Sequence, residues 1–175
     1  MKQYQFKLSV DSNRKVLAIE DKNNEAVGYV EKAVLKNCEE QNTYSYTSIR
    51  GTTVILGLKR RRFKDMNISK YIIVTDDAQH VFKEKPGRNL IQFKVVGQLD
   101  EHYMKVEENS DGDMEAHIDK KYVATVKEKG ADGNTAIMAD SELDDLSMKF
   151  GIIVLMYFMY KLYKRETWDV AKLLE

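Results

Sequence analysis

The chain has 175 residues, of which 43% are hydrophobic and 32% are charged, a composition that suits one globular domain and excludes a disordered chain. The 28 Lys and Arg residues balance the 28 Asp and Glu residues, so no overall charge attracts nucleic acid, and we expect no nucleic-acid partner. Cys38 is the single cysteine, and the N-terminal MKQYQFKLSV lacks the apolar core of a secretory signal. We therefore expect a single cytoplasmic domain over residues 1–175.

Alternation of apolar and polar residues predicts a series of β-strands over about residues 2–140. In the first strand one face carries Tyr4, Phe6, Leu8 and Val10. Further strand-like runs lie at 15–20, 26–32, 53–59, 71–76, 80–85, 90–99, 102–108, 114–119, 122–129 and 135–140. Turn signals such as Asp111-Gly112-Asp113 separate them. A sheet of about eleven antiparallel strands is expected to curl and close, because closure removes its exposed edges.

The most apolar stretch is FGIIVLMYFMY, residues 150–160, and we predict a helix around it from about 142 to 165. Acidic residues such as Asp144 at its start and basic residues such as Lys164 at its end match the direction of the helix dipole. Thr167 is an expected N-cap for a separate short helix over 167–174, with Trp168 folded back. Residues 150–160 have no polar stripe, so this part of the helix must be enclosed on all sides.

Two kinds of enclosure fit this helix. A bilayer needs roughly 20 apolar residues, and the apolar run is about half that length unless Lys149 and Lys161 extend their charged groups to the surface. A tail anchor therefore stays open as an alternative. The other enclosure is the barrel itself, because the lumen of so many strands is too wide to be filled by strand side chains alone. We favour the barrel, with the helix as its filling.

The order of these elements resembles a known superfamily. The strand pair MEAHIDKKYVATVKEKGADGNTAIMAD, the acidic turn after it and the helix FGIIVLMYFMY are similar to the tubby C-terminal domain superfamily, over about residues 100–160. That superfamily includes LURP-one-related proteins, phospholipid scramblases and short bacterial members, and this chain is most like the short bacterial type. The resemblance implies a closed antiparallel barrel of about twelve strands around a central hydrophobic helix. The final TWDVAKLLE departs from the family pattern.

Motifs for catalysis or metal binding are absent from the sequence. There is no phosphate-binding loop, dinucleotide fingerprint, nucleophile elbow or HExxH, so we expect neither an enzyme nor a cofactor. Glu115, His117 and Asp119 share one face of a predicted strand, but alternate strand residues stand about 7 Å apart, so we interpret them as a solvated face and expect no metal. Cys38 is interpreted as a structural thiol, and EENSDGDME as a hairpin turn rather than a calcium loop.

One basic run stands out in a chain whose charges otherwise balance. It consists of Lys59, Arg60, Arg61, Arg62, Phe63 and Lys64, and the pattern places it where a strand ends and a loop begins. Clustered cations beside an aromatic side chain suit an anionic lipid surface. Superfamily members that bind phosphoinositides use lysine and arginine on the barrel wall, a likeness in residue type only.

These observations predict a non-enzymatic binding module that docks on anionic phospholipid headgroups through Lys59 to Lys64, cytoplasmic and peripheral to the membrane. One alternative is a tubby-like scaffold that binds a protein partner and has no role with lipids. In that case the basic run is a solvated loop, partly neutralised by acidic neighbours such as Asp65, Asp76 and Asp77. A tail-anchored membrane protein is a further alternative.

Overall fold

The computed structural model describes all residues except 8–15, 62–67, 87–91, 132 and 174–175. The described residues form twelve strands and one helix. The strands are β1 (Lys2–Lys7), β2 (Val16–Asp21), β3 (Ala26–Lys32), β4 (Cys38–Ser48), β5 (Thr53–Lys59), β6 (Lys70–Val74), β7 (Gln79–Glu84), β8 (Lys94–Leu99), β9 (His102–Glu108), β10 (Met114–Ile118), β11 (Lys121–Lys129) and β12 (Asn134–Ala139). The helix is α1 (Met148–Leu173).

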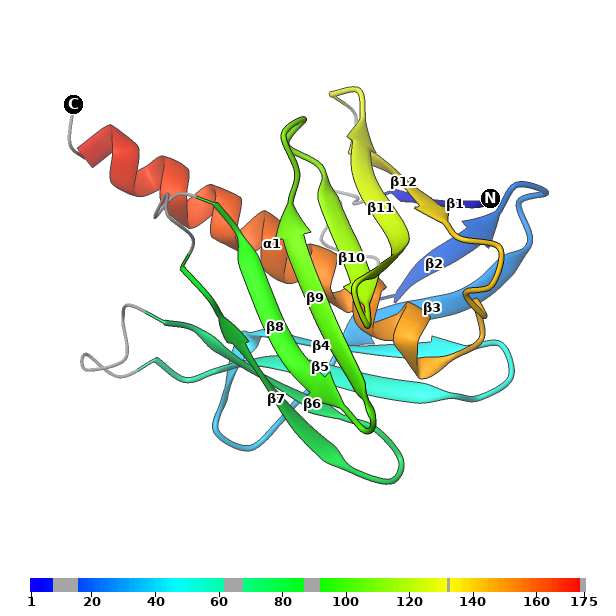
Figure 1. Cartoon of the computed structure of the whole chain (residues 1–175), viewed down its shortest axis with the longest axis horizontal. Coiled ribbons are helices and arrows are strands. Elements are labelled where there is room, and N and C mark those ends of the chain that lie inside the picture. Colours follow the sequence, from blue (N-terminus) through cyan, green and yellow to red (C-terminus); the bar gives the residue numbers. More distant parts are fainter. Residues whose placement is uncertain (8–15, 62–67, 87–91, 132, 174–175) are drawn as a thin grey trace.

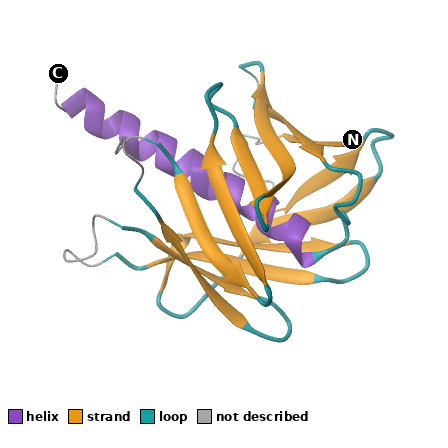
Figure 2. Cartoon of the chain, viewed as in Figure 1, coloured by secondary structure: helices purple, strands orange, loops and turns teal. Residues whose placement is uncertain are grey.

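The twelve strands close into one antiparallel barrel, as Figures 1 and 2 show. Each strand pairs with the next strand in the sequence, and β1 completes the ring by pairing with both β12 and β2. The pairing of β1 with β12 is longer than its pairing with β2, and it runs from Lys2 opposite Ala139 to Lys7 opposite Asn134. The predicted fold class, a closed antiparallel barrel of about twelve strands with a C-terminal helix, is confirmed.

Helix α1 passes through the barrel and supplies its core (Figure 1). Every residue from Phe150 to Tyr157 is buried, so all sides of this part of the helix meet strand side chains. Aromatic residues on the two partners meet edge to face: the centroid of Phe150 lies 4.8 Å from that of Tyr4, and that of Tyr157 lies 5.8 Å from that of Phe6. The apolar stretch is therefore the filling of the barrel.

A close approach fixes how α1 meets β4. A Cβ atom on Gly151 would lie 2.5 Å from the ring of Tyr46, so only glycine lets this fully buried ring lie against the helix backbone. The Tyr46 hydroxyl donates a hydrogen bond to the carbonyl oxygen of Asp145, 3.1 Å away, just before the helix. Strand β4 thereby holds the first turns of α1 in one position.

The helix differs from the prediction at both ends. It begins at Met148 rather than near 142, because the acidic residues of the 140–147 segment stabilise turns instead: Asp140 and Asp144 accept hydrogen bonds from the amides of Glu142 and Leu146. Ser147 is the N-cap, with its Oγ accepting from the amide of Phe150. There is no break at Thr167, and one continuous helix replaces the predicted pair, since no proline or glycine interrupts this part of the chain.

The predicted set of strands also needs revision. Strand β4, the longest strand described, was not predicted at all. The run at 90–99 contains a strand that begins only at Lys94, while the positions of Leu8 and Val10 in the first predicted strand lie outside the described residues.

The hairpin interpretation of EENSDGDME is confirmed, because this segment joins β9 to β10. Asn109 Oδ1 accepts hydrogen bonds from the amides of Asp111 and Asp113 in the turn.

Candidate functional site

The basic run starts at the end of the barrel from which the C-terminal part of α1 emerges. Lys59 is the last residue of β5 and lies opposite Cys38, the first residue of β4. Arg60 extends this pairing, since its amide donates to the carbonyl of Asn37 at 2.8 Å and its Nε donates to that of Cys38 at 3.2 Å. Both Lys59 and Arg60 are exposed. The sequence-predicted Arg62, Phe63 and Lys64 lie outside the described residues.

Arg61 differs from its neighbours because two carboxylates hold it. Its Nε donates to Glu39 at 2.9 Å, and its two terminal nitrogens donate to the two carboxylate oxygens of Glu166 at 2.8 and 2.9 Å. The hydrogen bonds from Arg61 to Glu166, assisted by those to Glu39, raise the pKa of the guanidinium although burial acts against this. Arg61 is therefore a permanent cation whose charge is already matched, and it was not recognisable as such from the sequence.

The neutralising partners are not those that the solvated-loop alternative named. Asp76 and Asp77 lie in the turn between β6 and β7, at the opposite end of the barrel, and Asp65 lies outside the described residues. Glu39 and Glu166 take their place. The second of these is on α1, so the ion pair ties the start of the basic run to the helix.

Beyond Glu166 the helix carries apolar side chains on the same face. Residues 166, 170 and 173 follow the i, i+4, i+7 spacing of one helical face, so Val170 and Leu173 continue the stripe that Glu166 begins. Both are exposed, Val170 by 56% and Leu173 by 85%. Figure 1 shows this part of α1 projecting beyond the strands. Sequence reasoning missed this stripe because it expected a separate short helix over 167–174, with Trp168 folded back.

Other exposed groups lie at the same end of the barrel. The connection from β3 to β4 carries Val34, which is 78% exposed, and the exposed Lys36. Trp168, on a different side of the helix from Glu166, is 64% exposed, and the ammonium of Lys172 lies 5.3 Å from its ring centroid. Carboxylates are interspersed here too, so this end combines separate cations with exposed apolar side chains rather than forming a purely basic patch.

Cys38 has the surroundings of a structural thiol. Its side chain is buried in β4, and burial raises the pKa of the thiol above its ordinary value, against the opposing effect of Lys59 and Arg60. A raised pKa keeps the sulfur protonated and poorly nucleophilic. The structure thus gives Cys38 the features that the sequence interpretation assigned to it.

The residues Glu115, His117 and Asp119 do not converge on a common point. Glu115 accepts a hydrogen bond from the side chain of Asn109 at 2.8 Å, His117 meets the ring of Tyr122, and Asp119 lies in the turn after β10, where its Oδ2 is 2.6 Å from Nδ1 of His102. Across the part of the chain that the structure describes, no group of three His, Cys, Asp or Glu side chains is arranged to hold a metal ion.

Within the described residues, no helix is both long enough and apolar enough to cross a membrane. This includes α1, the helix on which the tail-anchor alternative rested.

Comparisons with known proteins give few matches. No protein-family model matches the chain, and no curated protein matches its sequence. Among solved structures, the chain is similar to the crystal structure of a protein from Arabidopsis thaliana, with a TM-score of 0.44 and 14% sequence identity over 87% of this chain and 89% of the other.

Proposed function

We propose that this protein is a non-enzymatic binding module of the tubby-like type that docks reversibly on anionic phospholipid headgroups. The docking surface is the barrel end defined by Lys36, Lys59 and Arg60 together with Val34, Val170 and Leu173. The observation that carries the proposal is the ion pair of Arg61 with Glu166, which holds the start of the basic run beside the apolar stripe of the projecting helix.

The two kinds of side chain contribute differently to such docking. Each Lys or Arg near an anionic bilayer contributes about 1 kcal/mol, so the exposed Lys36, Lys59 and Arg60 attract the surface without binding it firmly. Val170 and Leu173 add apolar area that is buried when the helix end enters the headgroup layer. Weak contributions of both kinds give reversible, salt-sensitive docking, as suits a peripheral protein.

Arg61 has a positioning role in this proposal rather than a lipid contact. Its guanidinium already matches Glu39 and Glu166, so a phosphate would have to displace a carboxylate to reach it. Lys59 and Arg60, which flank it on the strand side, remain exposed. The predicted contact stretch from Lys59 to Lys64 is therefore narrowed, among the described residues, to Lys59 and Arg60 as headgroup contacts.

Co-sedimentation with vesicles tests the proposal. Wild-type protein should pellet with vesicles of phosphatidylcholine and phosphatidylserine, and less with phosphatidylcholine alone. The double variant Lys59→Glu and Arg60→Glu should weaken binding more than about tenfold, because it replaces two attractive charges by two repulsive ones. Val170→Ser with Leu173→Ser should weaken binding without changing the preference for anionic lipid.

The matched control is the double variant Lys22→Glu and Arg50→Glu, which makes the same charge change in turns at the opposite end of the barrel. It should bind like the wild type. Circular dichroism and a thermal melt confirm folding in each case, since Arg60 also donates to the Cys38 carbonyl. Absence of wild-type binding to anionic vesicles, or equal losses in the two double variants, would contradict lipid docking and leave the protein-binding scaffold as the better account.

A further inference from the structure

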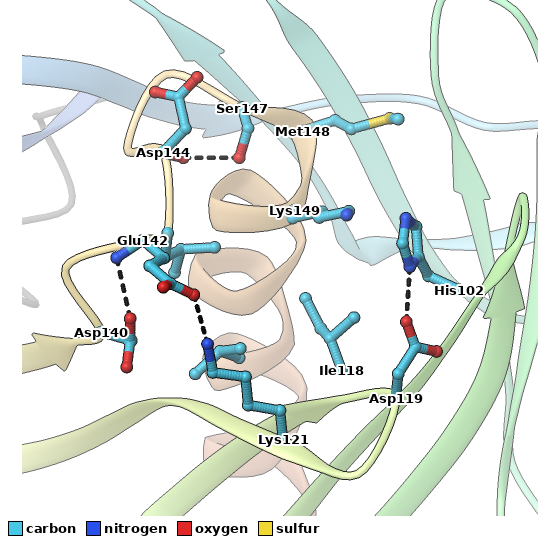
Figure 3. Close-up of a pocket in the computed structure, with 12 residues that line it drawn as sticks. His102, Ile118, Asp119, Lys121, Asp140, Glu142, Asp144, Ser147, Met148 and Lys149 are labelled. Atoms are coloured by element: carbon cyan, nitrogen blue, oxygen red, sulfur yellow. Dashed lines mark hydrogen bonds and ion pairs between the residues drawn. The ribbon is translucent and has the colours of Figure 1, made fainter.

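A cavity of about 660 Å³ lies at the other end of the barrel, where α1 begins (Figure 3). Its walls come from the start of β9, the β10–β11 hairpin, the turns of the 140–147 segment and the first turn of α1. The volume is within the range of about 300–1,000 Å³ that is typical of small-molecule sites. This cavity is separate from the proposed lipid-docking surface, and none of its lining residues belongs to that surface.

Part of the cavity wall is apolar. Ile118 and Val123 contribute from the β10–β11 hairpin, and Leu143 and Met148 contribute from the segment that leads into the helix. Val123 and Leu143 are nearly completely buried, while Ile118 and Met148 are half-buried and join the hydrophobic core from its edge. A hydrocarbon or aromatic group would find here a surface that releases water when covered.

The carboxylates that line the cavity already have partners. Asp119 accepts from the amide of Tyr103 at 2.8 Å and lies against His102, and the hydrogen bond with His102 holds the pKa of this carboxyl below its usual value. Glu142 pairs with Lys121. The remaining two, Asp140 and Asp144, accept hydrogen bonds from turn amides at 2.8 and 3.0 Å.

Lys149 is the exception among the charged groups of the cavity. It makes no hydrogen bond or ion pair within the described chain, and its charge acts on Asp119 only as a longer-range attraction. In Figure 3 its side chain extends across the cavity toward the ring of His102. Lys149 also lies in the first turn of α1, where the positive end of the helix dipole disfavours a cation by about 0.3–1 kcal/mol. A bound anion would remove both disadvantages.

We propose that this cavity binds an amphipathic monoanion, with a single carboxylate at the Lys149 ammonium beside the His102 ring and a hydrocarbon or aromatic body against Ile118, Val123, Leu143 and Met148. The four lining carboxylates select the charge of the ligand. They outnumber Lys121 and Lys149, so a doubly charged phosphate meets more repulsion than a carboxylate does.

Isothermal titration calorimetry of the full chain with decanoate, below its micelle concentration, tests this assignment. One decanoate should bind per chain. Decylammonium has the same tail and the opposite charge, and it should bind at least about tenfold more weakly, because it cannot pair with Lys149. Inorganic phosphate should not bind measurably. Absence of a decanoate signal, or equal affinities for the two amphiphiles, overturns the proposal.

Variants separate the roles of the charge and of the apolar wall. Lys149→Met should weaken decanoate about tenfold and leave the neutral probe decanol unchanged, whereas Ile118→Thr should weaken both. Lys22→Met, which removes a lysine from a turn outside the cavity, is the control and should leave both affinities unchanged. Lys149→Met relieves an unfavourable position, so its melting temperature should not fall. Unchanged decanoate binding in Lys149→Met contradicts the assignment of this lysine.

Discussion

Arg61 joins three elements that are far apart in the sequence: the end of β5, β4 through Glu39, and α1 through Glu166. Its side chain is 28% exposed, that of Glu39 is 15% exposed and that of Glu166 is 42% exposed. Loss of the guanidinium leaves the largely buried Glu39 carboxylate without a charged partner, which is costly, whereas water compensates the more open Glu166.

A double-mutant cycle should resolve these contributions. We expect Arg61→Met to lower the free energy of unfolding by about 1–3 kcal/mol and Glu166→Gln by less than about 1 kcal/mol, with a coupling of about 0.5–1 kcal/mol between them. Urea unfolding followed by circular dichroism measures the free energy of unfolding of the wild type, the two single variants and the double variant. Lys161→Met is the matched control, because the Lys161–Glu128 pair also comes from α1 but has both side chains open to solvent, at 38% and 43% exposed, so its loss should cost under about 0.5 kcal/mol. Equal costs for Arg61→Met and Lys161→Met would contradict the structural role of Arg61.

Gly97 of β8 is another residue whose identity has a physical reason. A Cβ at this position would lie 2.0 Å from the ring of Phe82 in the neighbouring strand β7, and this ring is fully buried. We expect Gly97→Ala to lower the free energy of unfolding by about 1–3 kcal/mol through overpacking. Phe82→Leu provides the control. In the protein with this smaller side chain, Gly97→Ala should lower the free energy of unfolding measurably less. Additive losses in the double variant would show that the ring is not the obstacle.

At the scale of the element, strand β4 shows where sequence reasoning fails. Its buried side chains include Asn42, Thr43 and Ser48, and its pairing with β5 is irregular between Cys38 and Thr43. The segment therefore has no apolar alternation that a periodicity argument could detect. Strands β1, β3 and β11 bury apolar residues in a pattern close to alternation, and for that reason their positions were predictable.

The existence of the helix could be predicted from the sequence, but the predicted bounds were wrong. Both outcomes have physical reasons. Eleven nearly continuous apolar residues required enclosure, and the barrel provides it. The position of its start depended on which groups the acidic residues would meet, and Asp140 and Asp144 meet turn amides. Likewise, the basic run was visible in the sequence, but the partners of Arg61 at positions 39 and 166 were not, because only the fold brings them together.

The burial of tyrosine side chains in the barrel also predicts a response to alkaline pH. Burial raises the pKa of Tyr46, Tyr71 and Tyr160 above the ordinary value of 10.0. Above about pH 10 the unfolded chain loses these protons while the native protein keeps them. The free energy of unfolding therefore falls as the pH rises above this value, and these groups leave it unchanged at lower pH. Each phenol contributes up to about 1.4 kcal/mol per pH unit.

Urea unfolding at several pH values from about 8 to 11 measures this dependence. The share of the tyrosinate absorbance that comes from the buried phenols should appear together with the loss of circular dichroism, because these phenols ionise only on unfolding. Tyr46→Phe should reduce the slope of stability against pH in the alkaline range while lowering stability at neutral pH, since the hydrogen bond to Asp145 is lost. Ionisation of all tyrosines in protein that remains folded would contradict this prediction.

At the scale of the whole molecule, the two ends of the barrel have different characters. One end carries the projecting helix, separate cations and exposed apolar side chains, and the other carries a cavity with a single unpaired lysine among its described charges. The balanced total charge of the chain concealed both features, because each depends on which residues the fold gathers. The cavity in particular left no signal in the sequence, because its lining comes from several separate segments.

The central position of α1 has a consequence for synthesis. All twelve described strands precede the helix in the chain, so a ribosome completes the wall, through Ala139, before the filling that begins at Met148 has been made. Until α1 emerges, inward side chains such as Val54, Leu56 and Ile73 have no partner in the lumen. The nascent chain therefore exposes a broad apolar surface late in translation, and folding is completed only once that segment leaves the exit tunnel. We expect chaperones to bind most strongly to ribosome-bound chains that are stalled just before α1 is synthesised.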